Sequence, residues 1–170
     1  MPVEKIRGLA WKFGDNIDTD QIIPARYCNT FNPEALGDHA MEGADPDFAR
    51  RVAPGDIIVA GRNFGCGSSR EAAPLALKAS GLGAIVAHSF SRLFFRNAVN
   101  IGLYIMVCPA ASELIDSGEE LLIDPVASTI HSQTNGRAYR CKQLPGFIDE
   151  IVHAGGMIEY VRKRAGREKD

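Results

Sequence analysis

The chain has 170 residues, 45% of them hydrophobic and 24% charged, which is typical of one soluble globular domain, so we expect residues 1–170 to form a single domain. A formal net charge of −2 excludes a general electrostatic attraction to nucleic acid or to an anionic membrane. The first residues lack the apolar core of a signal peptide and no run approaches a membrane span, so we expect a cytoplasmic protein.

The first third of the chain is predicted to contain a strand, a polar loop and a helix. Residues 9–13 have the pattern of a strand, and residues 15–24 follow as a loop with three carboxylates. The spacing and glycine of an EF-hand loop are missing, so these acids are either turn residues, or one of them orients a group in a site. The Asn-Pro pair at 32–33 is typical of a helix start, and the helix is predicted to run through Met41 before a connection at 44–55.

A glycine-rich stretch separates an apolar strand at residues 56–60 from a helix at residues 72–79. Its glycines let the backbone take positive φ and approach a ligand closely. Ser68 and Glu71 have the spacing of a capping box, which predicts that Ser68 begins the helix. A helix start favours an anion, and Arg70 adds donors that suit a carboxylate. The stretch lacks the motifs of a P-loop and of a dinucleotide fingerprint, so it is either another kind of anion-binding loop or a structural turn.

The second half of the chain changes character part of the way along. Strands are predicted at 84–87 and 103–108, with a helix at 89–100 between them. With the strand at 56–60 they favour parallel pairs joined by helices. A short helix at 111–117 precedes strands at 120–123, 128–132 and 138–142, with the hairpin signal Asn135-Gly136 between the last two. A helix at 148–161, interrupted at Gly155-Gly156, precedes a charged tail at 161–170 that we expect to be frayed. The order predicts one α/β domain with a second, antiparallel part.

Two questions stay open: which way two arginines of this half face, and whether one of the cysteines is reactive. Arg92 and Arg96 lie four residues apart on a predicted helix, so both face either a site or water. The cysteines, at positions 28, 66, 108 and 141, lack the spacing of a metal site, so we expect no metal held by this chain alone. Cys66, between two glycines, is either a thiol of lowered pKa or a small residue that fits.

Several separated motifs occur in a fixed order along the chain. They are Asn16-Ile17-Asp18-Thr19-Asp20, then Gly65-Cys66-Gly67-Ser68-Ser69-Arg70-Glu71, then Ser89-Phe90-Ser91-Arg92 with Asn97-x-x-Asn100-Ile101-Gly102. Together they resemble the small subunits of 3-isopropylmalate dehydratase, the stand-alone version of the aconitase swivel domain. The match covers about residues 7–161. It implies an α/β fold, a three-layer β/β/α swivelling domain of the aconitase C-terminal type, that works only with a large subunit.

The resemblance also implies roles for individual residues. Ser68 is the expected catalytic base, Asp20 supports the charge network of the site, and Arg70 binds a substrate carboxylate. The other expected substrate-binding residues are Gly67, Ser69, Cys28, Asn29 and Thr30. A [4Fe–4S] cluster is expected on the large subunit, through that subunit's own cysteines, which agrees with the unsuitable cysteine spacing of this chain.

The implied reaction interconverts 2- and 3-isopropylmalate by loss and readdition of water, in leucine biosynthesis. A serine acts as a base only where its alkoxide is strongly stabilised, which a helix N-terminus and Arg70 would supply. The recognition loop, Cys28-Asn29-Thr30, has no Arg, which argues against homoaconitate or citrate, yet it is more polar than an isopropyl group favours. Another alkylmalate, such as methylmalate or dimethylmalate, is an alternative substrate. A non-catalytic anion-binding assembly module is the alternative of a different class.

Overall fold

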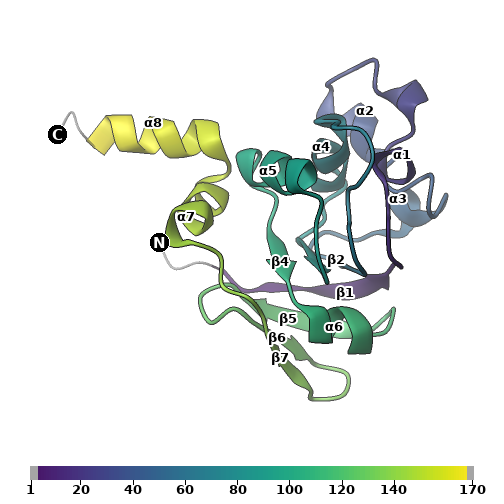
Figure 1. Cartoon of the computed structure of the whole chain (residues 1–170), viewed down its shortest axis with the longest axis vertical. Helices are drawn as coiled ribbons and strands as arrows, with labels where there is room; N and C mark the ends of the chain where they lie inside the picture. Colours follow the sequence, from purple (N-terminus) through teal and green to yellow (C-terminus); the bar gives the residue numbers. More distant parts are fainter. Residues whose placement is uncertain (1–3, 168–170) are drawn as a thin grey trace.

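Strand β1 joins a parallel half and an antiparallel half of one seven-stranded sheet (Figure 1). The computed structural model describes residues 4–167. The strands are β1 (Ile6–Lys12), β2 (Ile57–Ala60), β3 (Ala84–Ala87), β4 (Ile105–Val107), β5 (Glu120–Asp124), β6 (Thr129–Ser132) and β7 (Ala138–Arg140), in the order β4-β3-β2-β1-β5-β6-β7. Residues 10–12 of β1 pair in parallel with β2, and residues 6–9 pair antiparallel with β5. The parallel and antiparallel parts predicted from the sequence are both present.

The helices are α1 (Thr19–Ile22), the 3₁₀ helix η1 (Ala25–Tyr27), α2 (Pro33–Gly37), α3 (Phe48–Arg51), α4 (Ala72–Ala79), α5 (Arg92–Asn100), α6 (Pro109–Leu114), α7 (Gly146–Ala154) and α8 (Met157–Arg167). Helices α4, α5 and α6 flank the parallel half of the sheet (Figure 1). Figure 1 shows α4 and α5 on one side of the parallel strands, with α6 and strands β5–β7 on the other. Strands β2 and β3 are buried along their whole length, as expected of parallel strands covered on both faces. Antiparallel strands, parallel strands and helices form the three layers of the predicted β/β/α fold.

Two predicted bounds in the first third differ because of long-range backbone hydrogen bonds. Strand β1 begins at Ile6 rather than at residue 9, since its first residues pair with β5. The helix predicted to run through Met41 ends at Gly37. The Met41 N–H donates to the carbonyl of Ile22 at 2.7 Å, and Met41 has a φ of +59°. The chain therefore turns back onto α1 where local propensity favours a longer helix.

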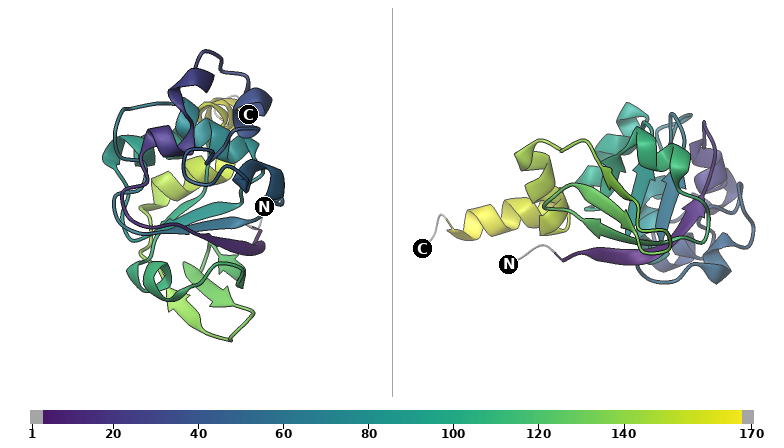
Figure 2. Two further views of the ribbon diagram at one scale, coloured as in Figure 1. Left: turned by 90° about the vertical axis from the view of Figure 1, so that its right-hand side faces the viewer. Right: turned by 90° about the horizontal axis from the view of Figure 1, so that it is seen from below.

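The C-terminal helices extend beyond the sheet. Helix α8 continues to Arg167, so the frayed tail predicted at 161–170 is wrong for residues 161–167, and the last three residues lie outside the described part. An ion pair between Glu159 and Arg162, at 2.7 Å, supports this helix from its own surface. Figure 2 shows α8 projecting away from the layers. Across residues 4–167, no helix is both long enough and apolar enough to cross a membrane.

A buried carboxylate, Asp56, fixes the start of β2. It accepts hydrogen bonds from the Leu9 N–H at 3.0 Å, the Trp11 Nε1–H at 2.9 Å and the Ala53 N–H at 2.9 Å. These bonds compensate the cost of burying its charge. They tie β1 to the amino end of β2 and so set the position of its carboxyl end, where open parallel sheets place their ligands.

Candidate active site

The glycine loop, residues 61–71, leaves the carboxyl end of β2 and lies between the segments that follow β1 and β3. On one side, the Thr19 N–H donates to the carbonyl of Cys66 at 2.9 Å. On the other side, the Phe64 N–H donates to the carbonyl of Ser89 at 3.1 Å. The three motifs that carried the resemblance therefore lie side by side, although they are far apart in the sequence.

The predicted capping box of Ser68 and Glu71 is wrong. Helix α4 begins at Ala72, and Glu71, at its N-cap position, has αR backbone and makes no side-chain capping bond. The carbonyl of Ser68 instead accepts a hydrogen bond from the Thr19 hydroxyl at 3.0 Å, and the preceding Gly67 has a φ of +90°. This long-range contact holds Ser68 in the loop, before the helix, with its side chain exposed to solvent.

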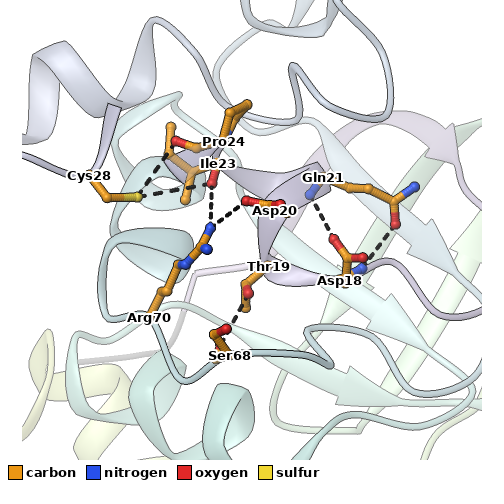
Figure 3. A network of polar contacts seen from close by, with 9 residues as sticks. All are labelled: Asp18, Thr19, Asp20, Gln21, Ile23, Pro24, Cys28, Ser68 and Arg70. Carbon is orange, nitrogen blue, oxygen red and sulfur yellow. Dashed lines mark hydrogen bonds and ion pairs between the residues drawn. The ribbon is translucent and has the colours of Figure 1, made fainter. Parts of the chain in front are cut away.

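Arg70 forms an ion pair with Asp20 across the site (Figure 3). Arg70 Nη1 lies 2.6 Å from Asp20 Oδ1 and 3.4 Å from the carbonyl oxygen of Ile23. The Arg70 side chain is 24% exposed and that of Asp20 is 65% exposed. The hydrogen bond from Arg70 lowers the pKa of Asp20 below its ordinary value, and the same bond raises the pKa of Arg70. The pair is thus fully charged near neutral pH.

The three carboxylates of the polar loop have three different partners. Asp18 caps helix α1: its Oδ1 accepts from the Gln21 N–H at 2.8 Å, and the Gln21 side chain accepts from the Asp18 N–H at 3.0 Å. Asp15 accepts from the backbone N–H of Arg62 at 2.7 Å. Asp20 alone reaches Arg70, which answers the question that the spacing of the three acids left open.

The structure brings part of the predicted recognition loop to Arg70. Cys28 Sγ and Arg70 Nη1 both approach the carbonyl oxygen of Ile23, at 4.0 Å and 3.4 Å (Figure 3). The Thr30 hydroxyl accepts the backbone N–H two residues further on, at 3.1 Å, and so stabilises a local turn. Asn29 is exposed. Of the three residues, Cys28 is the one that the structure places beside the Arg70–Asp20 pair.

A hollow of about 510 Å³ lies beside Asp20. It is lined by Asp18, Asp20, Gln21, Pro24, Ala25, Arg26 and Gly43. Arg26 is oriented by Glu42, at 3.0 Å, and by the ring of Tyr27, whose centroid lies 4.7 Å from the guanidinium. Sequence reasoning does not single out Gln21 or Arg26 as site residues. What could have identified them is their position in the sequence, because Gln21 directly follows the first motif and Arg26 lies just before the recognition loop.

The cysteines do not assemble a metal site. Burial raises the pKa of Cys66, with a smaller contribution from the nearby Asp18 carboxylate, so the alternative of a thiol with lowered pKa is wrong. Cys108 and Cys141 are buried together, and interaction with Cys141 lowers the pKa of Cys108 below its ordinary value. Within residues 4–167, no group of three His, Cys, Asp or Glu side chains could hold a metal ion. The part of the chain that the structure describes therefore does not bring together the thiolates that ligate an iron–sulfur cluster.

Comparison with known proteins places the chain in a family. Residues 39–111 match the family described as the aconitase C-terminal domain. The chain is 54% identical over 164 residues to a 3-isopropylmalate dehydratase small subunit of Thermodesulfovibrio yellowstonii, covering 96% of this chain and 98% of that protein. It is 49% identical over 159 residues to an isopropylmalate/citramalate isomerase small subunit of Methanocaldococcus jannaschii, covering 94% and 95%.

The same assignment follows from a solved structure. A crystal structure of 3-isopropylmalate dehydratase from Methanocaldococcus jannaschii superposes with a TM-score of 0.93 and 42% sequence identity, covering 98% of both chains. Fold, length and sequence agree in these matches, and the resemblance inferred from the motifs is confirmed. The chain belongs to the family of 3-isopropylmalate dehydratase small subunits, which are hydro-lyase subunits of the aconitase type.

Proposed function

We propose that this chain is the small subunit of a cytoplasmic two-subunit hydro-lyase that interconverts 2- and 3-isopropylmalate in leucine biosynthesis. The names of the relatives as small subunits imply a large-subunit partner. The observation that carries the proposal is the Arg70–Asp20 pair beside the exposed Ser68 and Ser69, in a chain of this family. A guanidinium suits a malate carboxylate, and a neighbouring hydroxyl can reach the carbon that loses its proton.

Arg70 is the proposed ligand of a substrate carboxylate. Both of its hydrogen bonds within the site involve Nη1, so its Nε–Nη2 edge can form a bidentate pair with a carboxylate. Asp20 acts by orienting this guanidinium, and it is therefore a positioning residue. Cys28 is proposed to contact the alkyl part of a substrate held there, and its approach to the same carbonyl as Arg70 supports this role.

Ser68 is the proposed base that removes the C–H proton. Its hydroxyl does not lie on the N-terminus of α4, so the helix dipole is not the main source of alkoxide stabilisation. We assign that stabilisation to Arg70, to the backbone N–H of Ser69, and to the exclusion of water when the large subunit closes over the loop. The φ of Gly67, +90°, is one that a residue with a side chain adopts only with strain. Because glycine has no Cβ, the backbone at this position can approach the substrate closely.

The iron–sulfur cluster of this enzyme class is proposed to be carried by the large subunit. The cysteines of this chain are divided between the site, at Cys28 and Cys66, and a buried pair, Cys108 and Cys141. This division supports a cluster ligated elsewhere. The isolated chain is therefore expected to be inactive and to bind substrate weakly.

Replacing Ser68 by Ala tests the catalytic role. In complex with the large subunit, Ser68→Ala is expected to lower kcat by about 10²–10⁴-fold, the usual contribution of a positioned acid–base group. Ser69→Ala is the matched control, because it removes the same atom from the next exposed residue, and we expect a smaller loss. Cluster absorbance and subunit association, measured on both complexes, must match the wild type. An unchanged kcat in Ser68→Ala would support a non-catalytic anion-binding module instead.

A smaller alkylmalate is the second candidate substrate, and one relative is named for both isopropylmalate and citramalate. The recognition loop offers Cys28, Asn29 and Thr30, which form no purely apolar pocket. Even a hydrophobic pocket discriminates between alkyl groups by only about 10–200-fold per methylene. Steady-state kcat/KM on malates with methyl, dimethyl and isopropyl substituents decides the question. Isopropylmalate is the physiological substrate if its kcat/KM is highest, and a higher value for a methylated malate overturns that assignment.

A further inference from the structure

A groove of about 780 Å³ separates helix α5 from helices α7 and α8. Its apolar lining includes Phe90 and Val99 on the α5 side and Phe147, Ile151 and Met157 on the other. The volume exceeds that of the hollow beside Asp20, yet none of the proposed site residues lines it. The proposed reaction therefore leaves this groove without a role.

The charged side chains of the groove all have one sign. Arg92 and Arg96 of α5 and Lys142, which follows β7, line it, and none of the described residues that line it is a carboxylate. The chain as a whole has a formal net charge of −2, so this local excess of positive charge is not a general property of the surface. The two arginines, which the sequence could assign either to water or to a site, thus flank an apolar groove.

The groove begins next to the glycine loop. Its lining residue Phe90 forms a parallel β-bridge with Phe64, and their ring centroids are 6.1 Å apart. The Ser91 N–H donates to the carbonyl of Phe64 at 2.9 Å, so the start of α5 is fixed to the loop. A protein that covers Ser68 and Arg70 therefore lies close to the mouth of this groove.

The C-terminal helices also expose large apolar side chains, one of them in the groove lining and two on α8 outside it. Phe147 is 62% exposed, Ile158 is 68% exposed and Val161 is 55% exposed. Ile158 and Val161 stand three residues apart on α8, which projects from the body and has no buried residue (Figure 2). An apolar groove rimmed by charge, with further apolar side chains exposed on an adjoining helix, is typical of a protein–protein interface.

We propose that this groove is a docking site for an acidic, partly apolar segment of the large subunit. The inference rests on the proposed function, because that function supplies the partner. The three cations select a segment with carboxylates, and the apolar lining accepts its aliphatic or aromatic side chains. Docking beside the loop would fix the distance between the two halves of the active site.

Charge reversal tests the docking site. The Arg92→Glu/Arg96→Glu double variant is expected to weaken association of the two purified subunits at least tenfold, and to flatten the salt dependence of the dissociation constant, measured calorimetrically at two ionic strengths. The control Arg50→Glu/Arg137→Glu makes the same change in net charge on exposed side chains outside the groove, and it is expected to stay within about threefold of the wild type. At saturating large subunit, the groove variant should recover the wild-type kcat.

The outcomes separate the two proposals. If the wild-type subunits associate but the groove variant and the control bind equally well, the docking site is wrong and the proposed function is unaffected. If the wild-type subunits neither associate nor turn over any alkylmalate, the proposed function itself fails. Should the groove variant misfold, as judged by its melting temperature, Phe147→Ser/Met157→Ser gives the same test through the apolar lining. A groove that instead binds small carboxylates, with subunit affinity unchanged in both groove variants, also overturns the proposal.

Discussion

Gly65 provides a direct test of how the loop is held, because two effects act against any side chain there. Its φ is +81°, and a Cβ built on it would overlap the buried ring of Phe94. The left-handed backbone costs an alanine about 1–2 kcal/mol, and forcing a methyl group into a packed site costs about 1–3 kcal/mol more. Gly65→Ala is therefore expected to lower the free energy of unfolding by about 2–5 kcal/mol.

Gly67→Ala is the matched control for this prediction. Gly67 has a similar φ, +90°, but the nearest atom to an added Cβ is Cβ of Asp18, at an ordinary 3.5 Å. The backbone cost and the lost flexibility of the unfolded chain are shared by both variants, so their difference isolates the contact with Phe94. We expect Gly65→Ala to be the less stable of the two by about 1–3 kcal/mol.

Urea unfolding of the isolated chain, followed by circular dichroism, measures both variants against the wild type. The double variant Gly65→Ala/Phe94→Ala completes a cycle, since removing the ring should relieve part of the cost of the added methyl group. A favourable coupling energy is the expected result. Equal stabilities for Gly65→Ala and Gly67→Ala would refute the close packing of the loop on α5, and strictly additive effects in the cycle would point the same way.

Three further predictions concern single side chains. Asp56→Ala should destabilise the chain by about 3 kcal/mol in urea unfolding, because three part-buried donors, including the Trp11 indole, lose their acceptor at about 1 kcal/mol each; a loss below about 1 kcal/mol contradicts this role. Arg70→Gln should raise the pKa of Asp20 toward 3.8 in a carboxyl NMR titration, because the hydrogen bond from the guanidinium that lowers this pKa is lost; an unmoved pKa contradicts the pairing. In the wild type, the pair contributes stability above pH 3.8 and loses it as the pH falls through the lowered pKa. Cys66 should react with iodoacetamide at pH 7.5 more slowly than a free cysteine peptide, because burial raises its pKa, and an equal rate measured by peptide mass spectrometry contradicts this.

The sequence by itself determined the local elements of the glycine loop and its flanks. Strand β2 and helix α4 lie where the change from an apolar run to a helical pattern predicts them, at Ile57–Ala60 and Ala72–Ala79. The turn at Asn135-Gly136 also follows from local chemistry, as Gly136 has a φ of +76°. The family assignment came from motifs that stand in the printed sequence. These features depend on residues that are close together in the sequence, so they can be read from the sequence alone.

Only the tertiary structure decided which distant groups meet. Local spacing favoured Ser68 as a helix cap, but the hydroxyl of Thr19 binds the Ser68 carbonyl and holds that residue in the loop. The partner of Arg70 was one of three acids that spacing could not rank, and the turn at the end of β1 selects Asp20. The sequence likewise left open whether Arg92 and Arg96 face water or a site. The packing of α7 beside α5 forms the groove that both arginines line.

The reason is the same in each case. Helical and strand periods describe a chain segment, whereas these contacts arise because parallel strands β1, β2 and β3 bring their carboxyl ends to one edge of the sheet. The segments that follow the three strands are far apart in sequence, and no local pattern records which of their polar groups will be neighbours. The sequence could therefore supply the parts of the site, while the order of strands in the sheet decided how those parts fit together.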